Sequence, residues 1–234
     1  MLYYIIWDSN MSWITEGIDK GRKIDDYYSF NGIELYIINP LPDGFNIEEV
    51  LTTVSSRVPR HLQRGVDIIY VGQFEDLVKR EMNAMFQDGA IYVTNLQSDA
   101  RDMVDDIIHE MAHSVEAEYP DLIFEDGRLF KEFIGKRKRL FNILSSEGYD
   151  VDPIFKTRPE YNKNIDYFLY KEVGYTLLNN LVSGLFPSAY SATSLREYFA
   201  IGFEEFFIGD RTYLKKICPI LYYKLESLAS MGEN

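Results

Sequence analysis

Two histidines four positions apart are the residues in this sequence best suited to chemistry. The segment HEMAH, residues 109–113, places the imidazoles of His109 and His113 one turn apart on the same face of a helix. Neutral imidazole suits Zn²⁺, and two rings at this spacing can bind one ion. Glu110 lies beside the first ligand, where it can accept a proton from a water molecule that the metal activates. The pattern therefore predicts one catalytic zinc ion per chain.

A catalytic zinc site needs a third protein ligand, with a fourth position left for water. The extended form of the motif is absent, because Glu116 and Tyr119 stand where its glycine and third histidine would be. The one spare histidine, His61, lies upstream in the basic segment 60–64, which disfavours a divalent cation. We therefore expect a downstream carboxylate as the third ligand, and the candidates are Glu160, Glu172, Glu197, Glu204 and Glu205.

Glu197 has a second interpretation. It follows Ser194 by three positions at the start of an expected helix. This is the spacing of a capping box, in which the glutamate bonds back to the amide of the N-cap residue. The residues alone leave both roles open, metal ligand and helix cap.

The segment YSATSLREYFA, residues 190–200, resembles one family when it is taken together with the HExxH motif. That family is the anthrax lethal factor-like zincins, gluzincin-type metallopeptidases that include the secreted Pro-Pro endopeptidases. Their members carry a tyrosine, six further residues and then a glutamate that opens a Glu-aromatic-Phe-Ala run, as Tyr190 and Glu197 do here. The resemblance implies that Glu197 is the third zinc ligand and that the Tyr190 hydroxyl faces the metal-activated water and the substrate carbonyl.

Two features depart from the family pattern. Ile201 stands where the family has a second glutamate, which supports the metal ligands from behind. We expect Glu204 or Asp106 to provide that support instead. The segment between His113 and Glu197 is also longer than in the family, which predicts an insertion within 121–165.

The elements that position these residues follow from hydrophobic periodicity and turn residues. Strands are expected over 33–39, 66–71 and 90–94, whereas residues 1–30 receive no assignment. Between the strands we expect a helix over 47–64, bent or broken near Pro59, and a second helix over 74–86. The HExxH helix is expected to begin after Ser98 as N-cap and to end near Glu118. Later helices are expected over 128–146, 165–183, 194–208 and 211–229, with a loop over 147–164.

This order predicts an α+β fold of zincin type. We expect a single domain over 1–234, with an α/β lobe built on a small mixed sheet (about 1–120) and a mainly helical lobe (about 121–234). In zincins an extended peptide pairs with the edge strand that precedes the catalytic helix, as in strand addition generally. That strand is expected to consist of Ala90, Ile91, Tyr92, Val93 and Thr94, which would therefore bind substrate.

Composition restricts the partners and the compartment. The 37 acidic and 24 basic residues give a net charge of −13, which repels nucleic-acid phosphates. Cys218 is the single cysteine, so no internal disulfide can form, which fits a reducing compartment. The N-terminus lacks a basic segment and a cleavage site, and no stretch approaches the roughly 18 apolar residues of a membrane span. We expect a cytoplasmic protein, or one exported or particle-associated by a route that leaves no sequence signal.

These patterns favour a zinc-dependent endopeptidase that acts on a peptide or protein substrate, with Glu110 as general base and Tyr190 as electrophilic helper. One alternative is a zincin-fold protein with reduced catalysis, kept as a structural or binding component. Another is a metal-independent helical interaction protein. A protein partner would dock on exposed aromatic residues or on the basic cluster 136–139, although that cluster also fits the solvated face of a helix.

Overall fold

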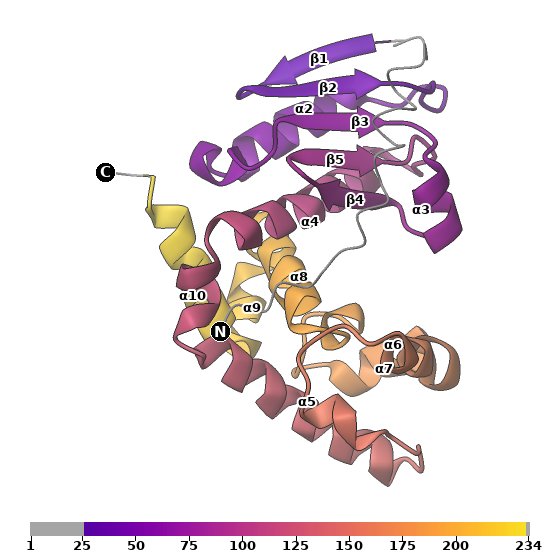
Figure 1. Ribbon diagram of the computed structural model, residues 1–234, viewed down its shortest axis with the longest axis vertical. Helices are drawn as coiled ribbons and strands as arrows, with labels where there is room; N and C mark the ends of the chain where they lie inside the picture. The colour runs from indigo at the N-terminus through magenta and orange to yellow at the C-terminus, as the bar shows by residue number, and fades with distance from the viewer. Residues whose placement is uncertain (1–25, 233–234) are drawn as a thin grey trace.

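A five-stranded mixed sheet lies at one end of the molecule, and helices make up the rest (Figure 1). The computed structural model describes residues 26–232. The strands are β1 (Asp26–Phe30), β2 (Ile33–Ile37), β3 (Ile68–Val71), β4 (Ala84–Gln87) and β5 (Ala90–Val93), in the spatial order β1-β2-β3-β5-β4. The three central strands run parallel, and β1 and β4 are antiparallel edge strands. The predicted α+β class is confirmed.

Two tight turns create both edge strands. Asn31 and Gly32 join β1 to β2 with φ angles of 52° and 96°, and Asp88 and Gly89 join β4 to β5 with φ angles of 49° and 82°. Two consecutive residues at positive φ are typical of a type I′ turn, whose twist matches that of the paired strands. The first turn accounts for β1, part of a region to which the sequence pattern assigned no structure. The rest of that region, residues 1–25, and the N-terminal segment examined for an export signal lie outside the described residues.

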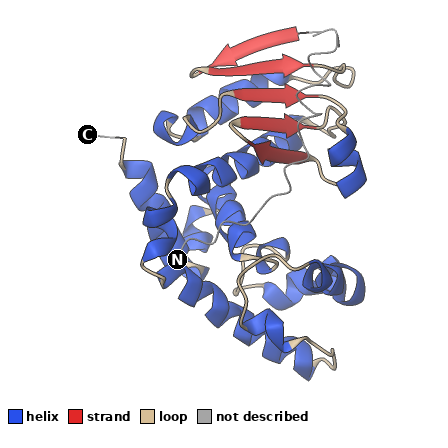
Figure 2. Ribbon diagram, in the orientation of Figure 1, coloured by secondary structure: helices blue, strands red, loops and turns tan. Residues whose placement is uncertain are grey.

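Helices make up most of the structure (Figure 2). Most of them follow the predicted ranges, with several interruptions. They are α2 (Ile47–Arg57), α3 (Glu75–Arg80), α4 (Ala100–Glu118), α5 (Arg128–Ser146), α6 (Lys163–Tyr167), α7 (Tyr175–Val182), α8 (Leu195–Phe207), α9 (Arg211–Ile217) and α10 (Pro219–Ser230). The predicted helices over 47–64 and 211–229 each break at a proline, Pro59 and Pro219, which has no backbone N–H to continue the hydrogen bonding. A π-helical segment, Phe168–Gly174, separates α6 from α7 within the helix predicted over 165–183.

The helix predicted over 74–86 is wrong in its second half. Helix α3 ends where Glu81 adopts a left-handed conformation with φ of 55°, and strand β4 follows. Met85 and Phe86 instead pair with Tyr92 and Ile91 of β5. Strand pairing supplied by a distant segment therefore overrides a helical spacing of apolar residues that is only local.

Helix α4 crosses the sheet next to β4 and β5 and packs against α2 (Figure 1). Its inward face buries Met103, Ile107, Met111 and Val115, which are at most 1% exposed. The inward residues of β2 alternate with half-buried ones, as expected for a strand with one covered face. The HExxH helix is thus anchored against the sheet by its own apolar stripe.

The outer side of the sheet carries a row of tyrosines, one from each of four strands. The ring centroids of Tyr27 and Tyr36 lie 5.2 Å apart, those of Tyr36 and Tyr70 5.9 Å, and those of Tyr70 and Tyr92 5.4 Å. The rings of Tyr36, Tyr70 and Tyr92 stack on one another, and the ring of Tyr27 is tilted against that of Tyr36, so each ring contacts its neighbour in the row.

The basic cluster 136–139 is not the surface patch that its charge suggested. Arg137 is fully buried between the rings of Phe133 and Phe155, and its guanidinium donates to backbone carbonyls from two separate segments. Lys136 is also buried and donates to two backbone carbonyls, those of Leu185 and Ile217. Two of the four charges therefore hold the helical lobe together, and only Lys138 and Arg139 face solvent.

Among residues 26–232, none of the helices combines the length and the apolar character needed to cross a bilayer.

Candidate metal centre

Helix α4 presents both motif histidines on one face. Its N-terminus is capped by Asp99, whose carboxylate accepts from the N–H groups of Arg101 and Asp102. The cap and the buried stripe fix the helix, so His109 and His113 point together toward α8, with ring centroids 5.1 Å apart. Both side chains are largely buried, at 16% and 10% exposure.

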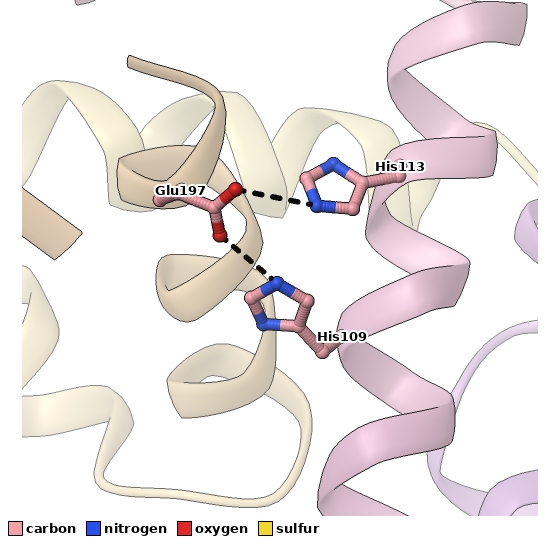
Figure 3. A group of neighbouring side chains, drawn as sticks. All are labelled: His109, His113 and Glu197. Atoms are coloured by element: carbon pink, nitrogen blue, oxygen red, sulfur yellow. Dashed lines mark hydrogen bonds and ion pairs between the residues drawn. The ribbon is translucent and has the colours of Figure 1, made fainter. Parts of the chain in front are cut away.

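Glu197 on α8 completes the group (Figure 3). Its Oε2 lies 3.1 Å from Nε2 of His109, and its Oε1 lies 3.9 Å from Nε2 of His113. One ligand atom from each of the three residues lies within 4.8 Å of the other two, a spacing at which a single ion can contact all three. Among the five carboxylates proposed from sequence, Glu197 is the one that meets both imidazoles.

The capping interpretation of Glu197 is half correct. Ser194 is the N-cap of α8, and its Oγ accepts from the N–H of Glu197 at 3.1 Å. The carboxylate of Glu197 points to the histidines (Figure 3). The backbone of Glu197 thus serves the cap, while its side chain belongs to the metal-ligating group.

Each imidazole is held from behind by a further carboxylate. Glu204, two turns after Glu197 on α8, hydrogen bonds to Nδ1 of His109. Glu116, one turn after His113 on α4, lies 2.8 Å from Nδ1 of that ring. A carboxylate at Nδ1 orients the ring and leaves Nε2 for a metal, as is usual for histidine ligands. Of the two supports expected from sequence, Glu204 makes this contact, whereas Asp106 accepts a hydrogen bond from Gln97.

This donor set fits zinc. Two nitrogens and one carboxylate oxygen match the ligand types of catalytic zinc sites. Burial alone would lower the pKa of His109, but its hydrogen bonds to Glu197 and Glu204 outweigh burial and raise that pKa well above its ordinary value. The pKa of Glu197 is lowered although burial opposes this, because His109 hydrogen bonds to it and both histidines attract its charge. The surroundings therefore favour positive charge at the point where the three side chains meet.

No family model, no curated protein and no solved structure matches this chain.

Glu110, the residue after His109 on α4, contacts the edge of the sheet. Its Oε2 accepts the backbone N–H of Phe86 at 2.7 Å, and its side chain is nearly buried. The turn at Asp88 and Gly89 makes Gln87 and Ala90 the closing hydrogen-bonded pair, so the N–H of Phe86 points away from β5. The outer edge of β4 thus fixes one oxygen of Glu110.

Tyr190 lies near the ring of His109. It sits in a short 3₁₀ turn (Tyr190–Ala192) before α8, and its ring centroid is 6.5 Å from that of His109. Burial, followed by the charges of Glu197 and Asp166, raises the pKa of its hydroxyl. Tyr190 therefore stays protonated at neutral pH and can donate a hydrogen bond.

The expectation that residues 90–94 form the edge strand is wrong. Strand β5 (Ala90–Val93) pairs with β3 on one side and with β4 on the other, so its backbone hydrogen bonds are used within the sheet. Ala90, Ile91, Tyr92, Val93 and Thr94 therefore cannot add a peptide strand. The outer edge next to α4 belongs to β4 (Ala84–Gln87), most of which the sequence pattern assigned to a helix, and on this edge the N–H of Phe86 is already bonded to Glu110.

The other predicted ligand candidates lie elsewhere. Nε2 of His61 lies 2.8 Å from the carbonyl oxygen of Leu228. Glu205 accepts the N–H of Asp210 at the end of α8, and Glu160 and Glu172 are exposed.

Three residues at the site were missed by sequence reasoning. Phe86 contributes only a backbone amide, which leaves no side-chain signal. Glu116 follows His113 by three positions, and this helical spacing could have identified it. Arg196 donates from Nε to Glu116 at 3.0 Å. The sequence signal for its place at the site was its position next to Glu197.

Proposed function

We propose that this chain is a zinc-dependent peptidase of gluzincin type with a zincin-like fold. Its proposed metal ligands are arranged as in the lethal factor-like zincins that its motifs resemble. One observation carries the proposal. Side chains far apart in the sequence, His109 and His113 on α4 and Glu197 on α8, bring their ligand atoms within 4.8 Å of one another. The carboxylates behind both imidazoles add to it, because histidines that bind a metal usually hydrogen bond to such a partner through their other ring nitrogen.

The arrangement of the sheet supports the same function. Strand β4 is antiparallel to β5, lies at the edge of the sheet and contacts α4. An extended peptide can pair with such an edge, and the peptide would then lie beside the HExxH helix. Substrate binding is therefore assigned to β4 in place of the segment 90–94.

The chemistry follows from the residues around the ligands. Zinc, when bound, supplies a Lewis acid that activates a water molecule and polarises the scissile carbonyl. Glu110 accepts the proton of the attacking water and later delivers it to the leaving amine. The N–H of Phe86 holds Oε2 of Glu110, which leaves Oε1 for the proton. The Tyr190 hydroxyl donates a hydrogen bond to the carbonyl oxygen as negative charge develops there.

The first experiment measures zinc and peptide cleavage on the same preparation. We expect about one zinc per chain and cleavage of members of a peptide library by the zinc-loaded protein. Glu110→Gln should retain the zinc and lose at least about a hundredfold in rate, and Tyr190→Phe should also retain the zinc and lose rate. Glu118→Gln, an exposed residue on the same helix, is the matched control.

Two outcomes would contradict the proposal. A folded protein that takes up no zinc on titration would remove the metal centre altogether. Zinc uptake without cleavage of any peptide, at neutral pH and over a full library, would instead support the structural or binding role that a zincin fold can also serve.

A further inference from the structure

A group of tyrosines around Asp166 lies close to the metal centre but has no part in the chemistry described above. The hydroxyl of Tyr161 donates to Oδ2 of Asp166 at 2.8 Å, and the hydroxyl of Tyr175 donates to Oδ1 at 3.5 Å. The ring of Tyr170 packs against that of Tyr175, with centroids 5.3 Å apart. We call Tyr161, Asp166, Tyr170 and Tyr175 the Asp166 cluster.

Two hydrogen bonds join segments beside the Asp166 cluster to segments beside the metal centre. The N–H of Leu195, two residues before Glu197, donates to the carbonyl of Pro159 at 2.8 Å, so the segment that leads to Tyr161 runs beside the start of α8. The N–H of Ala189, next to Tyr190, donates to Oδ1 of Asn179 on α7 at 3.0 Å. The cluster therefore adjoins both Glu197 and Tyr190.

The electrostatics agree with this placement. After burial, the charges of Glu197 and Asp166 are the largest causes that raise the pKa of Tyr190. Burial, the hydrogen bond to Asp166 and the charges of Asp166 and Glu197 raise the pKa of Tyr161 to about 12. The Tyr161 and Tyr190 hydroxyls thus lie in the field of these two carboxylates.

No lysine or arginine within residues 26–232 forms an ion pair with Asp166. Its carboxylate, which accepts two tyrosine hydroxyls, still has lone pairs for further donors. Tyr161 is 54% exposed, so aromatic surface beside this carboxylate is open to solvent. The ring of Tyr170 already holds a cation, because Nζ of Lys171 lies 4.0 Å from its centroid. A carboxylate bordered by an exposed aromatic ring is well suited to hold a cation, by charge and by cation–π attraction.

We propose that the Asp166 cluster binds a positively charged group of the peptide substrate. This inference rests on the proposed peptidase function and adds a substrate class to it. The group is the ammonium or guanidinium of a lysine or arginine side chain, or the free amino terminus of the peptide, since all three offer the same chemistry to Asp166.

Peptide kinetics test the proposal on the zinc-loaded full chain. Peptides with a blocked amino terminus carry lysine or its uncharged analogue norleucine at each position around the cleaved bond, and a further pair differs only in a free or acetylated amino terminus. We expect kcat/KM to be about tenfold higher for one charged member, and its position identifies the source of the cation. Equal kcat/KM within every pair would overturn the proposal, and this comparison needs no variant.

Variants then assign the preference to Asp166. Asp166→Asn, which keeps the side-chain shape, should reduce the ratio within the preferred pair to about one. Asp150→Asn removes an exposed negative charge on the same lobe and should leave the ratio unchanged. If the ratio of kcat/KM between the charged and uncharged peptides is unchanged in Asp166→Asn, another residue binds the positive group.

A binding measurement separates failure of this inference from failure of the proposed function. Nα-acetyl-lysine amide, Nα-acetyl-norleucine amide and glycine amide are titrated into the Glu110→Gln protein and followed by NMR. We expect a charged probe to shift signals of Tyr161 and Asp166, and Asp166→Asn to abolish the shift. If no peptide is cleaved but this binding is found, the peptidase fails and the cation site stands. If peptides are cleaved and no charged probe binds there, the cation site fails and the peptidase stands.

Discussion

Glu197 and Glu204 lie two turns apart on α8 and contact different nitrogens of one imidazole, that of His109. Glu197 lies 3.1 Å from Nε2, and Glu204 hydrogen bonds to Nδ1. The ring is therefore fixed on both edges by a single helix. Ile201, one turn after Glu197, carries no carboxylate, so the carboxylate at Nδ1 comes from Glu204 on the next turn.

The ligand role of Glu197 can be separated from its place in the capped first turn. Glu197→Gln should weaken zinc binding by more than about 100-fold, which exceeds the usual effect of removing a residue that only supports a metal ligand. The stability of the zinc-free protein should change little. Ser194→Ala should show the opposite pattern, a loss of about 1 kcal/mol in unfolding free energy with zinc affinity largely kept. Zinc titration and urea denaturation measure both. Equal zinc affinity in Glu197→Gln and in a Glu160→Gln control would remove Glu197 from the site.

The carboxylate behind His113 should influence zinc affinity without touching the ion. In Glu116→Gln the hydrogen bond to Nδ1 can persist, but the negative charge that favours a metal-bound imidazole is lost. We expect zinc affinity to fall by about 10-fold to 100-fold, measured by competition with a chelator. Glu118→Gln changes the charge equally on the exposed side of α4 and should have no such effect. The same loss in both variants would mean that only overall charge matters.

The raised pKa of Asp106 should make the stability of the zinc-free protein depend on pH. Burial raises its pKa from 3.8 to about 6 in the folded protein, with a smaller increase from the charge of Glu110, while the hydrogen bond from Gln97 opposes the shift. Above pH 6 the folded state holds an ionised, poorly solvated carboxylate. As the pH falls toward 4, the folded state takes up the proton before the unfolded state does, and the penalty disappears.

Asp106→Asn should therefore raise the unfolding free energy of the zinc-free protein by about 2–3 kcal/mol at pH 8 and change it little below pH 4. Urea denaturation at the two pH values provides the measurement. Asp43→Asn, at an exposed position, should have no effect at either pH. A uniform gain for Asp106→Asn at both pH values would contradict the assignment to ionisation.

Arg137 should be essential to the helical lobe. Its guanidinium donates to the carbonyls of Ala192 and Thr193, which precede α8, and to those of Phe155 and Arg158. Burial lowers its pKa to about 9, so it remains charged at neutral pH. Lysine cannot reach four acceptors, and Arg137→Lys should lower the unfolding free energy by about 2–4 kcal/mol.

Arg139→Lys is the matched control for Arg137→Lys, because it makes the same substitution at an exposed position two residues further along α5. It should change the unfolding free energy by less than about 0.5 kcal/mol. If urea denaturation shows equal stability for the two variants, the buried hydrogen bonds of Arg137 do not hold the lobe.

The sequence by itself determined the parts of the site that depend on local spacing. His109 and His113 share a helix face because four residues make about one turn, and the apolar stripe of α4 shows which side of the helix is buried. The resemblance selected Glu197 from five carboxylates. The boundaries of α5 and the α+β class also followed from local periodicity and turn residues.

Only the tertiary structure decided the contacts between distant segments. Strand β4 has a helical spacing of apolar residues, and its identity as the edge strand depends on pairing with β5. Arg137 belongs to a run of basic residues that resembles a surface patch, yet packing places it fully inside. Local pattern records which faces are apolar, whereas the choice of edge, the carboxylate behind each imidazole and the buried charge depend on which segments fold against each other.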